Sequence, residues 1–212
     1  MFSDGRQALR NFTVFIIDDD QGVLDALSRF LRAAGYKTKA YSSPQAFLDE
    51  HDPSMPGCAV LDLSMPRKNG LDVQHELMTR GIERPIIFLS GRGTVPASIE
   101  AMKAGAVDFL PKPFKDEELL SAIKVAEERD SVRLQRDAGR NAASKLIDKL
   151  TPREKEVMAL IVRGHMNKNI AHLLGTAERT IKEHRARVMR KLGISSVAEL
   201  VRLTSKVITE PR

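Results

Sequence analysis

The sequence has few of the features that mark exported or membrane-spanning proteins. Its 212 residues contain a single cysteine, Cys58. No disulfide bond can therefore form within the chain, and the apolar neighbours of Cys58 indicate a buried thiol, consistent with a reducing compartment. No basic segment followed by an apolar one stands at its start, and no apolar run is long enough to cross a bilayer. We therefore expect a cytoplasmic protein.

The histidines lack the neighbours of a zinc site. His165, His172 and His184 have no cysteine or carboxylate at the spacing of zinc ligands. The hydrophobic share of 42% and the charged share of 29% are ordinary for a globular protein. The chain length suits one large domain or two small ones.

The excess of basic residues lies in the last third of the chain. The net charge is +6, and residues 150–212 contain 13 Lys and Arg against 6 Asp and Glu. Residues 1–120 contain 14 Lys and Arg against 17 Asp and Glu. A polyanionic partner is therefore expected to bind the last third, unless these charges only form a solvated surface.

Apolar, strand-like segments alternate with segments of helical periodicity from Thr13 to about Glu128. The predicted strands are 13–17, 36–40, 58–62, 85–89 and 106–110. The predicted helices lie near 21–34, 44–51, 70–80 and 95–104, with a last one from 115. Five alternating βα units predict an α/β domain with a five-stranded parallel sheet and helices on both faces. Every strand then ends at the same edge of the sheet.

Polar side chains follow four of these strands. Asp18 and Asp19 come after the first, Asp62 ends the third, Ser90 follows the fourth and Lys112 the fifth. Crowded carboxylates favour a bound cation, and few oxygen ligands suit Mg²⁺. Metal, ammonium and hydroxyl together can surround a transferring phosphoryl group. Asp62, alone at its strand end, is the candidate nucleophile and would form an acyl phosphate.

These motifs resemble the CheY-like receiver domains of two-component systems. The resemblance covers residues 12–128 and rests on Ile16-Ile-Asp-Asp-Asp20, Leu61-Asp-Leu-Ser-Met-Pro66, Leu89-Ser90 and Phe109-Leu-Pro-Lys-Pro-Phe114. The runs at 90–96 and 101–106 are similar to the FixJ-type subgroup.

The resemblance implies strand order 2-1-3-4-5 and phosphorylation of Asp62 by the phosphohistidine of a sensor histidine kinase. Asp18, Asp19, Asp62 and the backbone carbonyl of Ser64 would hold Mg²⁺. It further implies roles for three residues near the phosphoryl group and one unusual peptide bond. Ser90 and Lys112 would bind it, Phe109 would turn inward when Ser90 moves, and the Lys112–Pro113 bond would be cis. Arg92 lies close after Ser90, where it could tune the phosphoryl lifetime.

A charged segment joins this domain to the last third. Residues 129–148 are predicted to form a helical extension and linker, with a flexible point at 138–144. A dimeric coiled coil would need a sustained heptad pattern, which the segment lacks.

Residues 149–212 are predicted to form an all-α domain of four helices. Thr151-Pro-Arg-Glu154 has the capping-box pattern of a helix start, and Asn167 can cap the second helix. The third helix, from about 177 to 192, has one apolar face and one basic face. The basic face suits a DNA major groove, as in a helix-turn-helix, although an ordinary helix with a solvated basic face has the same pattern. That face carries Arg179, Lys182, Glu183, Ala186, Arg187 and Arg190.

Residues 149–203 resemble the LuxR-type helix-turn-helix. The resemblance rests on Leu150-Thr-Pro-Arg-Glu-Lys-Glu-Val157, Gly164-His-Met-Asn-Lys-Asn-Ile-Ala171, Glu178-Arg-Thr-Ile-Lys-Glu-His-Arg185, Arg187-Val-Met-Arg-Lys-Leu-Gly193 and Ser196-Val-Ala-Glu-Leu-Val201. It implies binding to a double-stranded operator as a dimer. Lys182, Glu183 and Ala186 would lie nearest the bases. The implied contacts to the DNA backbone are Asn167, Lys168, Thr180, His184, Arg187 and Lys191. Val197, Leu200 and Val201 would pair two DNA-binding domains.

Two residues depart from the LuxR pattern. Ala177 stands where the family usually has a capping serine, so Thr176 is the expected cap. Glu183 stands where a small apolar residue is common. Its carboxylate could accept a hydrogen bond from cytosine or could simply repel phosphate, which leaves the operator sequence open.

The sequence is identified as a member of the FixJ/NarL class of response regulators. We expect a transcriptional regulator that needs Mg²⁺, dimerises on phosphorylation and turns over no substrate beyond its own phosphoryl group. RNA polymerase is a further candidate partner, and an unphosphorylated receiver that masks the recognition helix is an alternative switch. A haloacid-dehalogenase-like phosphatase would need an acid where Ser64 stands. A constitutive DNA binder with a vestigial receiver is the other alternative.

Overall fold

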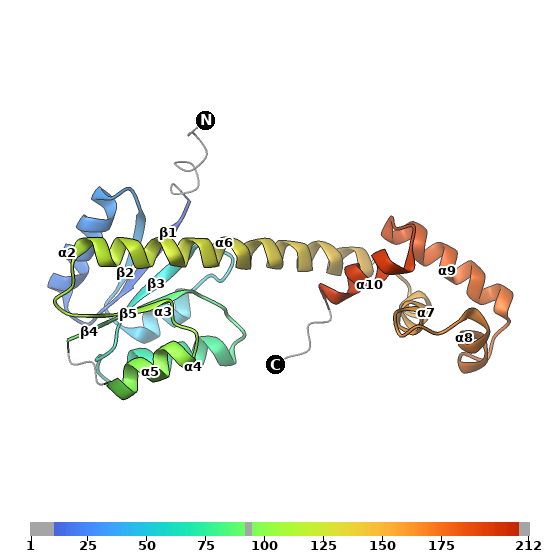
Figure 1. The fold of residues 1–212 in the computed structure, drawn as a ribbon, viewed down its shortest axis with the longest axis horizontal. Coiled ribbons are helices and arrows are strands. Elements are labelled where there is room, and N and C mark those ends of the chain that lie inside the picture. The colour runs from blue at the N-terminus through green and yellow to red at the C-terminus, as the bar shows by residue number, and fades with distance from the viewer. Residues whose placement is uncertain (1–10, 92–94, 208–212) are drawn as a thin grey trace. The chain divides into compact units, whose positions relative to one another are not determined.

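The computed structural model describes residues 11–91 and 95–207, and the chain divides between Leu134 and Gln135 into two compact units. Figure 1 gives the element labels. Arg92 lies outside the described residues, so its expected influence on the phosphoryl lifetime stays a prediction. The division falls inside the segment predicted as an extension and linker.

The first unit contains a parallel sheet of five strands in the order β2-β1-β3-β4-β5, as predicted. The strands are β1 (Thr13–Ile17), β2 (Lys37–Tyr41), β3 (Gly57–Asp62), β4 (Ile86–Ser90) and β5 (Asp108–Pro111). The three central strands are buried along their whole length. Both faces are covered, and this explains why their sequences are apolar without interruption.

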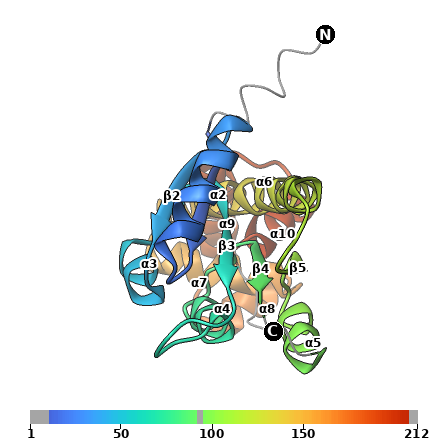
Figure 2. The ribbon, with the colours of Figure 1, turned by 90° about the vertical axis from the view of Figure 1, so that its left-hand side faces the viewer.

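Helices cover both faces of this sheet, as Figure 2 shows. They are α2 (Gln21–Ala33), α3 (Pro44–Glu50), α4 (Gly70–Thr79), α5 (Val95–Lys103) and α6 (Asp116–Ile147). Alternate residues of β1 point to opposite faces. Val14 and Ile16 pack with α2 and α6, whereas Phe15 and Ile17 pack with α3, α4 and α5. Two apolar layers therefore hold the strand ends in fixed register.

Helix α6 continues for 32 residues and passes through 138–144 without a break. The residues predicted as a flexible point are thus helical, and their flexibility stays a prediction. A single helical glycine, Gly139, costs only about 1 kcal/mol relative to alanine, and the surrounding Ala, Arg and Gln residues favour helix. Leu146 and Ile147 at its end pack against the core of the second unit, which stabilises the last turns.

The second unit adds four helices to the end of α6. They are α7 (Pro152–Val162), α8 (Asn167–Leu173), α9 (Glu178–Leu192) and α10 (Val197–Ser205). The predicted capping box is present, because Thr151 Oγ1 accepts from Glu154 N–H and a Glu154 oxygen accepts from Thr151 N–H. Gly193 ends α9 with φ 67°, a conformation that glycine adopts without strain.

Two predicted helix caps are wrong. Asn167 is the first residue of α8 rather than its cap, and its Oδ1 accepts a hydrogen bond from Arg185 Nη1 at 3.3 Å. Thr176 lies one residue too early to cap α9, because its N–H closes the preceding turn on Ala171 O at 3.0 Å. Ala177 occupies the cap position without a side-chain hydrogen bond.

Candidate functional site

Two carboxylates and one ammonium group meet at the C-terminal edge of the sheet. Asp18 follows β1 and Asp62 ends the neighbouring strand β3; both are buried. Lys112, which follows β5, donates from Nζ to Asp18 Oδ2 at 2.8 Å and to Asp62 Oδ1 at 2.7 Å. The edge predicted from the strand ends therefore brings these three residues together.

The other oxygen of each buried carboxylate is held by the backbone of the loop that follows. Asp18 Oδ1 accepts from Asp20 N–H at 2.9 Å, and Asp62 Oδ2 accepts from Ser64 N–H at 2.7 Å. Asp19 is exposed to solvent beside them. Each loop thereby fixes the orientation of its carboxylate before any ligand arrives.

Lys112 remains a cation in this site. Burial alone would lower the pKa of its ammonium group, but the hydrogen bonds to Asp18 and Asp62 outweigh burial and raise that pKa above its usual value. The ammonium therefore compensates the like charges of the two carboxylates at neutral pH.

Ser90 presents a hydroxyl beside this ion pair. It is the last residue of β4, which pairs with β3, and only 1% of its surface is exposed. Within the described residues, its Oγ has no hydrogen-bond partner. A buried polar group without a partner costs about 1–3 kcal/mol, so this hydroxyl is suited to donate to an oxygen-rich ligand. The carbonyl of Ser90 also accepts from Lys112 N–H at 2.7 Å, which ties the ends of β4 and β5 together.

Phe109 lies half-buried on β5. Its ring centroid is 6.2 Å from that of Phe88, and it packs against the core layer that contains α5. The Lys112–Pro113 peptide bond is cis, as predicted.

Two residues at this edge have structural roles that sequence reasoning missed. Asp20 caps α2 by accepting from the N–H groups of Gly22 and Val23. Gly70 begins α4 against the end of β3, where a Cβ would lie 2.6 Å from the carbonyl oxygen of Asp62. The position of Asp20 just before a predicted helix could have indicated its role as a cap. The close approach of Gly70 to Asp62 depends on the tertiary fold.

The donor set suits a magnesium ion. Among the residues that the structure describes, no three side chains of the His, Cys, Asp and Glu types group closely enough to bind a metal by themselves. Mg²⁺ typically takes one or two carboxylates and keeps several waters. Buried Asp18 and Asp62, with exposed Asp19 and the Ser64 carbonyl nearby, meet that requirement. The Ser90 hydroxyl, without a partner among residues 11–91 and 95–207, is a donor for a second ligand.

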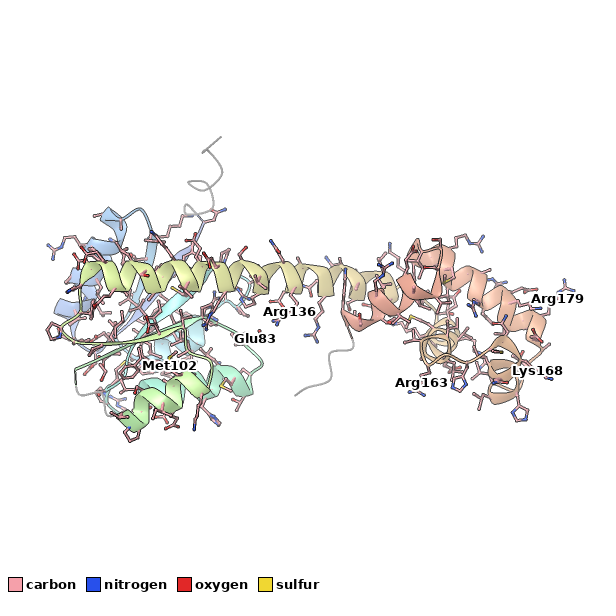
Figure 3. All side chains as sticks on the ribbon, viewed as in Figure 1. Glu83, Met102, Arg136, Arg163, Lys168 and Arg179 are labelled. Atoms are coloured by element: carbon pink, nitrogen blue, oxygen red, sulfur yellow. The ribbon has the colours of Figure 1, made fainter. Side chains whose placement is uncertain are left out.

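The second unit presents a basic helix face. On α9, the predicted apolar face is buried and consists of Ile181, Val188 and Leu192, whereas the side chain of Arg179 is 92% exposed. Figure 3 shows Arg179 extending beyond the ribbon at the start of this helix, and Lys168 on α8. The other exposed residues of this α9 face are Lys182, Glu183, Ala186, Arg187 and Arg190. Thr180 and His184 are half-buried.

Lys191 is held away from this face by α7. Its Nζ lies 2.6 Å from an oxygen of buried Glu154 and 3.4 Å from the carbonyl of Lys149. The hydrogen bonds from Lys191 and from Thr151 N–H lower the pKa of Glu154 to about 2. Lys191 therefore positions α9 on α7, and its predicted contact with DNA phosphate would require breaking this ion pair.

The predicted pairing surface on α10 is smaller than expected. Leu200 is fully buried in the core of its own unit, so its prediction as a dimer contact is wrong. Apolar spacing alone could not separate core residues from interface residues. Val197 is half-buried and Val201 is 40% exposed, so these two remain candidates for contact with a partner.

Two family models match this chain. Residues 14–124 match the response regulator receiver domain, and residues 148–204 match the bacterial regulatory proteins of the luxR family. No helix among the described residues is long and apolar enough to cross a membrane.

Similar proteins cover nearly the whole chain. The response regulator protein TodT of Pseudomonas putida is 40% identical over 93% of this chain and 87% of its own. Nodulation protein W of Bradyrhizobium diazoefficiens is 43% identical over 90% and 84%. The structure of the response regulator StyR is 40% identical, with a TM-score of 0.74, over 92% of this chain and 99% of its own.

The structure of full-length FixJ from B. japonicum is 35% identical, with a TM-score of 0.54, over 94% of this chain and 98% of its own. These matches span the sheet edge that holds Asp18, Asp62 and Lys112 in the first unit and the basic helix α9 of the second. This chain belongs to the family of two-component response regulators that join a receiver domain to a LuxR-type DNA-binding domain and regulate transcription.

Proposed function

We propose that Asp62 accepts a phosphoryl group from the phosphohistidine of a sensor kinase and that this modification switches operator binding. The observation that carries the proposal is the Lys112 ammonium, which joins buried Asp18 and Asp62 beside Ser90, whose hydroxyl has no hydrogen-bond partner in the described part of the chain. These groups lie at one edge of the sheet. They suit a phosphoryl group whose negative oxygens bind Lys112, Ser90 and a metal cation.

The proposed reaction places each group in a distinct role. An oxygen of Asp62 attacks phosphorus, the bond from phosphorus to the donor imidazole breaks, and its electron pair leaves with the nitrogen. The Lys112 ammonium turns from the carboxylates to a phosphoryl oxygen, and Ser90 Oγ donates to another. Asp18, Asp19, Asp62 and the Ser64 carbonyl would hold Mg²⁺, which supplies positive charge for the phosphoryl oxygens.

The proposed signal passes from Ser90 to the surface of α5 and β5. When Ser90 moves toward the phosphoryl group, Phe109 fills the space behind it and the α5–β5 surface changes shape. This surface exposes apolar side chains, with Val95 at 72%, Ile99 at 48% and Met102 at 45%. Their exposure supports a role in binding a second copy of the chain after phosphorylation.

Dimerisation would raise operator affinity without any new DNA contact. Two copies of α9 on one dimer bind two half-sites, and the second binding event becomes intramolecular. Each DNA-binding domain then needs only a modest affinity for its half-site, because the dimer binds the whole operator more tightly.

The decisive test is intact mass after incubation with acetyl phosphate, with and without Mg²⁺. Wild type should gain one phosphoryl group only with Mg²⁺, and Asp62→Asn should gain none. Asp49→Asn, an exposed carboxylate on α3, is the matched control and should behave as wild type. No gain in the wild type, or an equal gain in Asp62→Asn, would remove the proposed phosphoacceptor.

The switch itself is tested by sedimentation and DNA binding of the phosphorylated protein. Phosphorylation should shift the protein from monomer to dimer and tighten operator binding. A phosphorylated protein that stays monomeric both in solution and on DNA contradicts the dimer switch. Tighter DNA binding without dimerisation would favour release of a masked recognition helix instead.

A further inference from the structure

The exposed face of α9 carries a carboxylate between two guanidinium groups. Arg179, Glu183 and Arg187 follow one another at four-residue spacing, which places them along one line of the helix. Their side chains are 92%, 52% and 52% exposed. This line lies opposite the buried residues of α9, on the face that the proposed function assigns to DNA.

The two arginines approach different oxygens of Glu183. Arg179 Nε lies 3.6 Å from Oε1, and Arg187 Nη2 lies 3.9 Å from Oε2. Both distances exceed that of a good hydrogen bond. The guanidinium groups therefore compensate the charge of the carboxylate, and neither of its oxygens accepts a hydrogen bond from the residues that the structure describes.

This compensation matters because DNA repels an isolated carboxylate. Phosphates dominate the electrostatics of protein binding, and a negative side chain on a recognition helix opposes the attraction of its lysines and arginines. Arg179, Glu183 and Arg187 together carry a net positive charge. The helix face stays cationic, and Glu183 can enter the groove with its neighbours.

A carboxylate in the major groove selects bases by what it can accept. Cytosine offers its N4 amino group, and its neighbouring ring position carries only C–H. Adenine also offers an amino group, but its N7 lone pair lies beside it and repels a carboxylate oxygen. Guanine and thymine present acceptors there. Cytosine is therefore the base that suits Glu183.

We propose that Glu183 is a specificity-determining residue that selects a C·G base pair in the operator by accepting a hydrogen bond from cytosine N4. Arg179 and Arg187 act as positioning residues that hold the carboxylate and offset its charge. The inference rests on the proposed function of α9 in DNA binding. Ala186, one turn further along the same face, is small and leaves room for the carboxylate to reach the base edge.

The test is selection of binding sites from a pool of double-stranded DNA of random sequence. The full chain is used after treatment with acetyl phosphate and Mg²⁺, and again without treatment. Glu183→Gln keeps the size of the side chain and Glu183→Ala removes it. Glu156→Gln on α7 is the matched control, since Glu156 is 54% exposed and also pairs with an arginine, Arg153.

Wild type should enrich sites with a conserved cytosine that both Glu183 variants lose. We expect the preference for that base to fall on the order of tenfold in Glu183→Ala. In Glu183→Gln it should shift toward adenine, which pairs with an amide. The Glu156→Gln control should keep the wild-type preference.

Two outcomes overturn the inference, and they are distinguishable. Enrichment of the same sites by wild type and both Glu183 variants, with only tighter binding overall, would mean that Glu183 merely repels phosphate. The proposed DNA-binding function would then still stand. Failure of every protein to enrich any site, with or without treatment, would overturn the proposed function and the inference together.

Discussion

Lys112 is the residue on which the charge balance of the receiver pocket depends. Replacing it with methionine keeps an unbranched side chain, one heavy atom shorter, but leaves Asp18 and Asp62 buried without this counter-charge. We expect Lys112→Met to destabilise the Mg²⁺-free protein by about 2 kcal/mol. Mg²⁺ should stabilise this variant more than wild type, because the metal then supplies the missing positive charge.

Urea denaturation with and without Mg²⁺ measures both effects. Lys39→Met, an exposed lysine on the edge strand β2, is the control and should lose little stability. Equal Mg²⁺ responses in Lys112→Met and wild type would show that the ammonium and the metal do not share these carboxylates.

His51 makes the stability of the first unit sensitive to acid. Its ring packs 4.9 Å from that of Phe47, and burial together with the nearby Arg84 guanidinium lowers its pKa to about 4. The unfolded chain, with a histidine pKa near 6.5, binds the proton more readily than the folded one. Stability should therefore fall as pH drops from about 6.5 to about 4, by at most ~1.4 kcal/mol per pH unit.

His51→Gln should remove this acid sensitivity while keeping an acceptor beside Arg84. Urea midpoints across this pH range report the difference between variant and wild type. His75 is exposed on α4, and His75→Gln serves as the control. Parallel pH profiles for all three proteins would exclude His51 as the source.

The sequence predicts the positions of site residues that strand ends fix, but not of those that a contact between distant residues fixes. Asp18, Asp62, Ser90 and Lys112 follow apolar strands, and parallel strands end at one edge, so the sequence pattern alone brings them together. Lys191 could not be assigned in this way. Its partner Glu154 lies 37 residues away on another helix, and the spacing along α9 does not reveal that contact.

Helix α6 is anchored to the sheet by a buried ion cluster beyond the predicted end of the receiver domain. Asp130 accepts from the N–H of Gly57 at 2.9 Å and from Arg133 Nε at 2.8 Å, and lies 3.6 Å from Arg84 Nη1. Arg133 Nη1 donates to the carbonyl of Pro53 at 2.9 Å. These contacts join α6 to the N-terminal edge of the sheet, opposite the edge that holds Asp18, Asp62 and Lys112.

Removing the charge of Asp130 should destabilise the first unit strongly. Asp130→Asn leaves two buried guanidinium groups without their shared carboxylate, and we expect a loss of about 3–5 kcal/mol. Glu128→Gln, an exposed acid one half-turn earlier on α6, should change stability by less than about 0.5 kcal/mol. Chemical denaturation of each full-length variant, compared with wild type, measures these changes in the free energy of unfolding. A small effect of Asp130→Asn would mean that the cluster is replaceable.

The elements that the sequence predicted well are those with strong local periodicity. Each strand and receiver helix lies within about two residues of its predicted range. An uninterrupted apolar run marks a strand that is buried on both faces, and a 3.6-residue apolar repeat marks the buried face of a helix. The continuation of α6 through Gly139 was missed for the opposite reason. Its residues are polar on most sides, so no apolar repeat marks the helix there, and the packing of Leu146 and Ile147 against the second core depends on the tertiary fold.

At the scale of the whole molecule, the chain joins two cores that have different chemical tasks. The first unit concentrates buried carboxylates at a sheet edge, and the second concentrates basic side chains on one helix. Helix α6 contributes Leu119 and Ile123 to the first core and Leu146 and Ile147 to the second. The proposed pairing of receiver domains would thus bring two DNA-binding domains together without a change in either core.

A single added charge tests whether the exposed apolar face of α5 pairs two receiver domains. Ile99→Lys places a cation in the middle of the apolar residues exposed on α5 and leaves Asp18, Asp62, Ser90 and Lys112 unchanged. The variant should gain a phosphoryl group as wild type does, yet stay monomeric and bind an operator roughly 10–100-fold more weakly than phosphorylated wild type. Met78→Lys is the matched control, because Met78 is 54% exposed but lies on α4. If Met78→Lys abolishes the dimer and Ile99→Lys does not, the receiver domains pair through α4, and the path from Ser90 through Phe109 to α5 is wrong.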